Sequence, residues 1–166
     1  GLNEKALLAS GRKKGTDYET VVINQKSHAG YYPQATPITL KLLFDKEGKI
    51  LGAQAVGQDK VDKRIDTIAT VMSMQGTTEN LAKLELAYAP PFSSAKDPVN
   101  MLGFVAENIR NNMVSFVTPA ELDLLLQAEH EGVTVLDVTE EAERMVFSIP
   151  GSVHMPLGTL RSRLRE

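Results

Sequence analysis

The sequence predicts an α+β fold, in which a three-stranded antiparallel sheet is packed with helices and is followed by a truncated α/β segment. Three runs rich in apolar and β-branched residues come early and close together, which is typical of antiparallel strands. The apolar spacing then changes from alternation to the three-and-four pattern of helices. Near the end of the chain, a continuous apolar run follows a helix start, which is the pattern of a buried parallel strand.

The first elements are a short helix and three strands. Residues 3–10 form the expected helix, which Asn3 can cap and Gly11 can end. The polar run 45–49 is expected to close a hairpin, because Gly48 is free to adopt a positive φ. The three expected strands cover residues 18–25, 38–44 and 50–56.

Helical spacing begins at Val61 and continues to Met74, with one apolar stripe. A second, short helix is expected after Thr77, which can act as its cap. The two prolines within 89–94 predict an irregular segment, because proline removes a backbone donor. Pro98 then suits the first turn of a helix that runs to about residue 111.

The second region begins after residue 111. Residues 114–117 are compatible with a short strand, and the run TPAE from Thr118 is a strong helix start. We expect this helix to bury three leucines, and the elements after it to be a buried strand, a turn with a short strand, and a charged helix. The leucines are Leu122, Leu125 and Leu126, and the elements are 133–138, 149–156 and 158–166.

Composition narrows the function. The 166 residues suit one domain or two small ones, and the 42% hydrophobic content is that of a globular protein. A net charge of −3 argues against nucleic acid as a partner. No apolar run is long enough to span a membrane, and no secretory signal begins the chain, so we expect a cytoplasmic protein.

The chain contains no cysteine, which excludes disulfides, thiolate metal sites and thiol nucleophiles, and we expect no metal. The absence of cysteine is also compatible with a reducing cytoplasm. Only three histidines, His28, His130 and His154, remain as candidate bases. We therefore expect this chain alone to be inactive as an enzyme.

Three motifs carry a family resemblance. YAPPFSSAKDPVN at 88–100, SHAGYYP at 27–33 and VDKRID at 61–66 resemble the dimerisation domain of the pyridine nucleotide–disulfide oxidoreductases. Within that family they look most like the branch of coenzyme A–disulfide reductases, NADH oxidases and polysulfide reductases. The resemblance assigns residues 1–111 to this domain.

Residues 112–166 resemble the first part of a rhodanese domain, through TPAE at 118–121, VLDV at 135–138 and IPGSVHMPL at 149–157. Thr139 departs from the family, which has arginine there, and Phe147-Ser148 stand in place of Gly-His. The resemblance implies that the rhodanese cysteine loop lies beyond residue 166. A sulfurtransferase activity of this chain is excluded, because no thiolate can accept sulfur.

The reductase resemblance implies a homodimeric parent enzyme that uses FAD and NAD(P)H, bound mainly by domains upstream of residue 1. It implies coenzyme A disulfide or a persulfide as substrate, and tyrosines that enter the partner's active site. By motif position these are Tyr31 and Tyr88, with Tyr32 in reserve for Tyr31. A neutral phenol can donate a hydrogen bond to a developing thiolate or supply a proton. Buried interface tyrosines with satisfied hydroxyls are the alternative.

Further positions have a functional and a structural interpretation. Pro90 and Pro91 either contact the partner's flavin or form a stiff turn. Lys63 and Arg64 either bind coenzyme A phosphates or occupy a solvated helix face.

His28 is either a general base or a loop histidine bonded to the backbone. Asp97 is favoured as a helix cap over a partner for Lys96 across a dimer. The alternative to a reductase fragment is that the whole chain is a stand-alone protein-interaction module with no catalytic parent.

Overall fold

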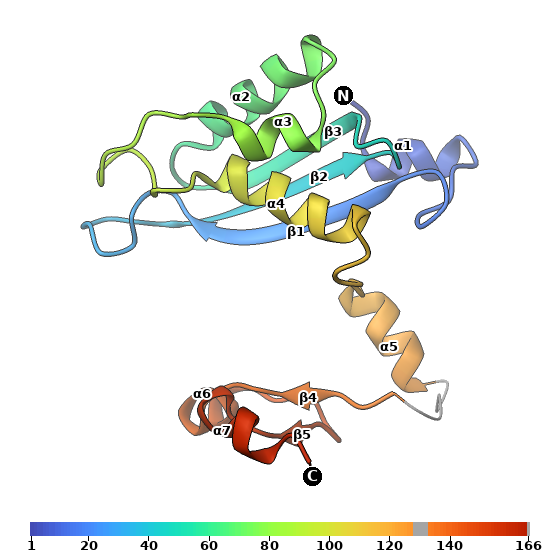
Figure 1. The fold of residues 1–166 in the computed structure, drawn as a ribbon, viewed down its shortest axis with the longest axis vertical. Helices are drawn as coiled ribbons and strands as arrows, with labels where there is room; N and C mark the ends of the chain where they lie inside the picture. Colours follow the sequence, from blue (N-terminus) through green and yellow to red (C-terminus); the bar gives the residue numbers. More distant parts are fainter. Residues whose placement is uncertain (128–132, 166) are drawn as a thin grey trace. The chain divides into compact units, whose positions relative to one another are not determined.

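A computed structural model describes residues 1–127 and 133–165, so that His130 lies outside the described residues. The chain forms two compact units, Gly1–Phe116 and Val117–Glu166 (Figure 1). Among the helices of the described residues, none combines the length and the apolar character needed to cross a membrane.

The first unit contains the predicted sheet. Strands β1 (Glu19–Lys26), β2 (Pro37–Phe44) and β3 (Ile50–Gly57) pair antiparallel in that order. Their ends agree with the expected ends to within one residue. The hairpin between β2 and β3 is also confirmed, because Gly48 has a φ of +84°.

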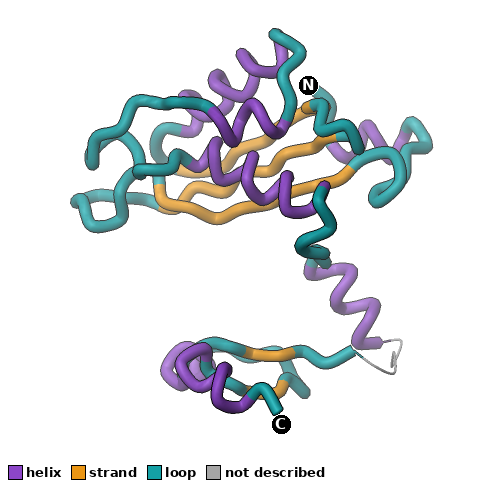
Figure 2. Tube along the Cα trace, in the orientation of Figure 1, coloured by secondary structure: helices purple, strands orange, loops and turns teal. Residues whose placement is uncertain are grey.

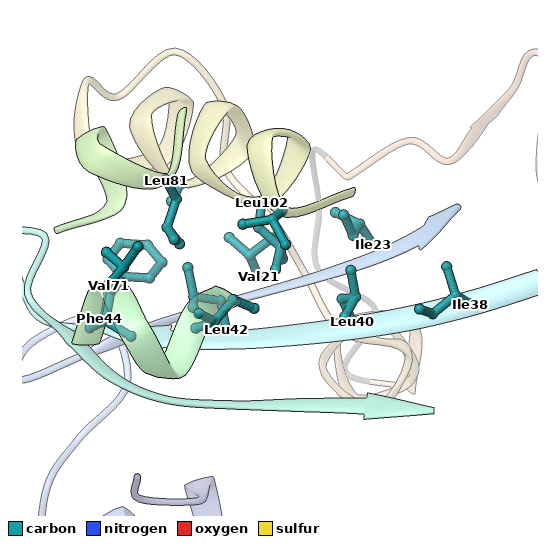
Figure 3. Packing of buried hydrophobic residues seen from close by; sticks show 13 residues of the cluster. Val21, Ile23, Ile38, Leu40, Leu42, Phe44, Val71, Leu81 and Leu102 are labelled. Carbon is teal, nitrogen blue, oxygen red and sulfur yellow. The ribbon is translucent and has the colours of Figure 1, made fainter. Parts of the chain in front are cut away.

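Helices α2 (Val61–Ser73), α3 (Thr78–Lys83) and α4 (Pro98–Arg110) pack against the sheet, and Figure 2 shows the three helices and three strands together. The three-and-four spacing thus gives the expected helices, with a capping box at Thr77. Their apolar stripes meet the inward-facing side chains of the strands in a single core (Figure 3). This core includes Val21, Ile23, Leu40, Leu42, Phe44, Ile68, Leu81, Val99 and Leu102.

A smaller cluster joins helix α1 (Glu4–Ala9) to β2. Leu43 alternates with the core-facing residues of β2 and packs instead with Leu7 and Tyr18. Asn3 caps α1 through its side chain, as its sequence predicts, and Gly11 follows the helix with a φ of +80°. The central strand is therefore covered on both faces near its end.

The close contact of α4 with α3 depends on Gly103. A Cβ at this position would lie 2.4 Å from the backbone nitrogen of Ala82 and 2.8 Å from the carbonyl oxygen of Thr78. We expect Gly103→Ala to lower the free energy of unfolding by about 1–3 kcal/mol, because the helix backbones must separate. The expected loss is a net value, in which the gain of about 1 kcal/mol that alanine brings to a helix interior is already included. Urea denaturation followed by circular dichroism measures it.

Gly158 provides the matched control, since it also lies in a helix but has only Glu140 Oε1, at 4.0 Å, near a built Cβ. Gly158→Ala is expected to leave stability unchanged or slightly raised. If Gly103→Ala behaved in the same way, the interpretation of a backbone contact between α3 and α4 would be wrong.

The second unit contains short elements. Helix α5 (Pro119–Gln127) begins at the expected Thr118, whose backbone nitrogen donates to Glu121 and whose hydroxyl accepts in return. Strands β4 (Leu136–Asp137) and β5 (Val153–His154) pair parallel, and this confirms the parallel arrangement. The remaining helices are α6 (Glu141–Val146) and α7 (Leu157–Arg163).

Several expectations for this unit are wrong. Residues 114–117 form no strand, and the run 133–138 pairs only over two residues, because β5 is equally short. None of the residues described in α5 is buried, since Leu122 and Leu126 line an open groove with Phe147. Helix α6 was not predicted, because its start is a Glu140–Glu143 capping box rather than an apolar period.

Candidate functional site

The structure brings Tyr31 and Tyr88 together. Tyr31 lies in the loop between β1 and β2, and Tyr88 lies in the extended segment between α3 and α4. The two hydroxyl oxygens are 2.9 Å apart, although the residues are 57 positions apart in the chain. The motif positions alone named both tyrosines, and only the fold shows that they form a pair.

Both tyrosines are open to solvent in this chain, with 77% of Tyr31 and 49% of Tyr88 exposed. The hydrogen bond with Tyr88, and to a lesser degree lost hydration, raises the pKa of Tyr31 above its ordinary value. Tyr31 is therefore neutral at pH 7. Because a phenol is both donor and acceptor, one hydroxyl of the pair donates to the other and the second proton remains available to an outside acceptor.

Tyr32 is placed differently from Tyr31. Its ring meets the ring of His28 edge to face, with centroids 5.9 Å apart. The Nε2 atom of His28 lies 3.1 Å from the carbonyl oxygen of Pro33, and the imidazole is buried. Of the two interpretations for His28, a loop histidine bonded to the backbone is the one that the geometry supports.

Pro90 and Pro91 are tied to the rest of the site through their carbonyl groups. The backbone nitrogen of Ala29 donates to the carbonyl oxygen of Pro90 at 3.3 Å, and Lys60 donates to that of Pro91 at 2.5 Å. Both prolines remain partly exposed. The loops of Tyr31 and Tyr88 are thus joined by direct contacts.

The expectation of a solvated helix face is wrong for Arg64. Its side chain is fully buried and donates to both carboxylate oxygens of Asp97 and, at 2.9 Å, to the carbonyl oxygen of Ser27. This burial also leaves no surface on Arg64 for a coenzyme A phosphate to reach. Lys63, its neighbour in α2, is partly exposed.

Asp97 is the helix cap that the sequence favoured, because its carboxylate accepts from the backbone nitrogen of Val99. The same carboxylate accepts from the hydroxyl of Ser93 at 2.6 Å. The ammonium of Lys96 instead lies 5.7 Å from the ring centroid of Phe104. One buried carboxylate therefore starts α4 and binds α2.

Lys60 is a further residue of this site, and no sequence motif singled it out. It precedes α2, has a φ of +58°, and brings its ammonium to 3.0 Å from His28 Nδ1. In the sequence it is one of several charged residues in a polar stretch. Its left-handed backbone and its partners are properties of the folded chain alone.

In the second unit, Asp137 accepts hydrogen bonds from Thr139 and from Arg144. These contacts, the bonds from Thr139 first, lower the pKa of Asp137 below its ordinary value. Arg144 also reaches Ser152, which precedes β5. Asp137 thus holds the loop that follows β4.

The sheet covered by helices and the exposed tyrosine loops correspond to a known class of domain. Residues 1–98 match the family described as pyridine nucleotide-disulphide oxidoreductase, dimerisation domain. The chain belongs to this family, which confirms the resemblance for this part of the sequence.

Individual proteins that are similar to this chain give more detail than the family does. Coenzyme A disulfide reductase of Staphylococcus epidermidis is 42% identical over 95 residues, which are 57% of this chain and 22% of that protein. The crystal structure of reduced Bacillus anthracis CoADR-RHD matches all of this chain and 29% of its own, with 48% identity and a TM-score of 0.92. A NAD-dependent persulfide reductase from A. fulgidus matches all of this chain and 28% of its own, with 39% identity and a TM-score of 0.83. This chain thus spans about a quarter of the length of these relatives.

Proposed function

We propose that this chain is a C-terminal part of an FAD-dependent, NAD(P)H-driven disulfide reductase that acts on coenzyme A disulfide or a persulfide. The observation that carries the proposal is the hydroxyl pair of Tyr31 and Tyr88, held at 2.9 Å on two exposed loops. The printed functions of the relatives, a coenzyme A disulfide reductase and a persulfide reductase, support the choice of substrates.

In this proposal the chain forms a homodimer in the cytoplasm, and its tyrosines complete the active site of the partner. Membership of a dimerisation-domain family supports the pairing role. Both tyrosines are exposed in this chain, and a second subunit that covered them would bury their side chains in the interface.

The residues present fit a contact with FAD rather than a complete binding site for it. Because the carbonyl groups of Pro90 and Pro91 are engaged within this chain, their partly exposed rings are what a flavin would meet. A bound FAD would supply the route for electrons from NAD(P)H to the disulfide. The domains that hold FAD and NAD(P)H belong to the remainder of the proposed enzyme.

The tyrosine pair stabilises the thiolate that leaves when the disulfide is reduced. An alkyl thiol has a pKa of about 8.5 and a phenol one of about 10, so proton transfer from tyrosine to the thiolate is uphill. The outward proton of the pair therefore acts as a hydrogen-bond donor to the thiolate, and solvent supplies the proton later.

We also propose the domain limits 1–111 and 112–166, with the second part rhodanese-like. The end of α4 at Arg110 supports the first limit. The parallel pair β4–β5 and the loop held by Asp137 support the second assignment.

The test uses the whole flavoenzyme that this proposal implies. We expect Tyr88→Phe to lower kcat for coenzyme A disulfide by about tenfold to hundredfold, since one hydrogen bond to a charged group contributes about 1.5–3 kcal/mol. Release of coenzyme A thiol at saturating NAD(P)H measures it.

Tyr18→Phe is the matched control, because Tyr18 is buried against α1 and takes no part in the pair. Unchanged turnover in Tyr88→Phe would refute the role of the tyrosine. A wild-type enzyme that reduces neither coenzyme A disulfide nor a coenzyme A persulfide would refute the substrate class.

A further inference from the structure

Three segments that are far apart in the sequence meet at the amino-terminal end of α2. Ser27 and His28 follow β1, Lys60 and Arg64 belong to α2 and its start, and Pro91 belongs to the loop before α4. The contacts run from Lys60 to His28 and Pro91, and from Arg64 to Ser27. Both tyrosine-bearing loops are therefore bound to the same helix end.

Lys60 makes the contact that bridges the two loops. Its ammonium lies 3.0 Å from His28 Nδ1 and donates to the carbonyl oxygen of Pro91 at 2.5 Å. The carbonyl of Pro33 can only accept, so His28 Nε2 carries a proton toward it, and Nδ1 faces both Lys60 and the Ser27 hydroxyl, which lies 3.2 Å away. Asp59, 3.2 Å from the ammonium, balances its charge.

The backbone of Lys60 is held in an unfavourable conformation. Its φ of +58° lies in the left-handed region, which residues with a side chain rarely adopt. Such a conformation persists where surrounding contacts hold it, and it is frequent at functional sites. Here the carbonyl oxygen of Lys60 accepts from Arg64 Nη1 at 3.3 Å, and its ammonium contacts His28 and Pro91.

The tyrosine pair depends on these loops, because packing does not hold it. Tyr31 lies three residues after His28, and Tyr88 lies three residues before Pro91. With 77% of Tyr31 exposed, its ring position follows from its loop. The direct backbone bond between the loops, Ala29 to Pro90, is long at 3.3 Å.

We propose that Lys60 is a positioning residue, which sets the distance between the Tyr31 and Tyr88 hydroxyls by tying their two loops to the start of α2. Its effect on turnover rests on the proposed reductase function, whereas its effect on the tyrosine geometry does not. Lys60 suits a test better than Arg64, because its side chain is 20% exposed and Arg64 is fully buried.

The first measurement is carried out on this chain. Labelling only the Cζ carbon of tyrosine with ¹³C gives four signals, one for each tyrosine, at neutral pH. We expect Lys60→Met to shift the signals of Tyr31 and Tyr88 and to leave that of Tyr18 in place, as evidence of a retained fold. Lys60→Arg keeps a cationic donor, so the signals of Tyr31 and Tyr88 are expected to stay close to their wild-type positions. Lys46→Met changes an exposed lysine in the β2–β3 turn and is expected to shift none of the tyrosine signals.

The second measurement is a double-mutant cycle on kcat in the whole enzyme. Lys60→Met is expected to lower kcat for coenzyme A disulfide about tenfold and to leave the KM for NAD(P)H unchanged. In a Tyr88→Phe background the same change is expected to have no further effect, because the pair it positions is already lost.

The outcomes separate the two proposals. Additive losses in the cycle, or unmoved tyrosine signals in Lys60→Met, would overturn the positioning role. The signals of Tyr31 and Tyr88 could shift in Lys60→Met while the whole wild-type enzyme reduces neither coenzyme A disulfide nor a persulfide. That result would overturn the proposed function and support the role of Lys60 in the tyrosine geometry. Moved signals with an unchanged kcat would overturn the role of Lys60 in the reaction.

Discussion

Arg64→Met is expected to lower the free energy of unfolding of the first unit by about 3–5 kcal/mol, the usual cost of removing one partner from a buried ion pair. Arg64 and Asp97 are 0% and 2% exposed, and their charged atoms are 2.9 Å apart. Without Arg64, the carboxylate of Asp97 stays buried with the neutral donors Ser93 and Val99. The carbonyl oxygen of Ser27 also loses a donor. Urea denaturation followed by circular dichroism measures the loss.

Arg12→Met is the matched control, because it removes an exposed arginine from the turn after α1. Its expected effect is within about 0.5 kcal/mol. The double change Arg64→Met with Asp97→Asn should recover part of the loss, since asparagine still caps α4 and leaves no unpaired charge. A loss for Arg64→Met no larger than that of Arg12→Met would contradict a structural role for the pair.

Phe44→Ala is expected to cost about 3–5 kcal/mol, because its ring is fully buried at the end of β2 and alanine leaves a cavity. Figure 3 shows Phe44 between the sheet and the helices, close to Val71 and Leu42. These residues belong to the core that the sheet shares with α2, α3 and α4. Thermal and urea denaturation both report it.

Substitutions at Phe44 that remove different amounts of buried volume are expected to cost different amounts of stability. Phe44→Leu keeps most of the buried volume and should lose clearly less stability than Phe44→Ala. Phe92→Ala removes a ring that is 61% exposed and should change stability by about 0.5 kcal/mol at most. Equal losses at positions 44 and 92 would show that burial does not determine the cost.

The second unit shows where local patterns are insufficient. The helix start at Thr118 was predicted correctly, because capping is settled by residues within one turn. The burial of Leu122 and Leu126 was not, since burial requires another element to cover them. For the same reason the apolar run 133–138 gives only a two-residue strand beside β5.

The sequence by itself determined the elements of the first unit and their order, because periodicity and caps are local properties of the chain. The family resemblance named Tyr31 and Tyr88 as candidates. Only the tertiary structure decided that Tyr31 and Tyr88 share a hydrogen bond, that Arg64 is buried, and that Lys60 joins two loops. These contacts join residues 31 to 57 positions apart. No local pattern encodes them, because they depend on how the helices and loops pack on the sheet.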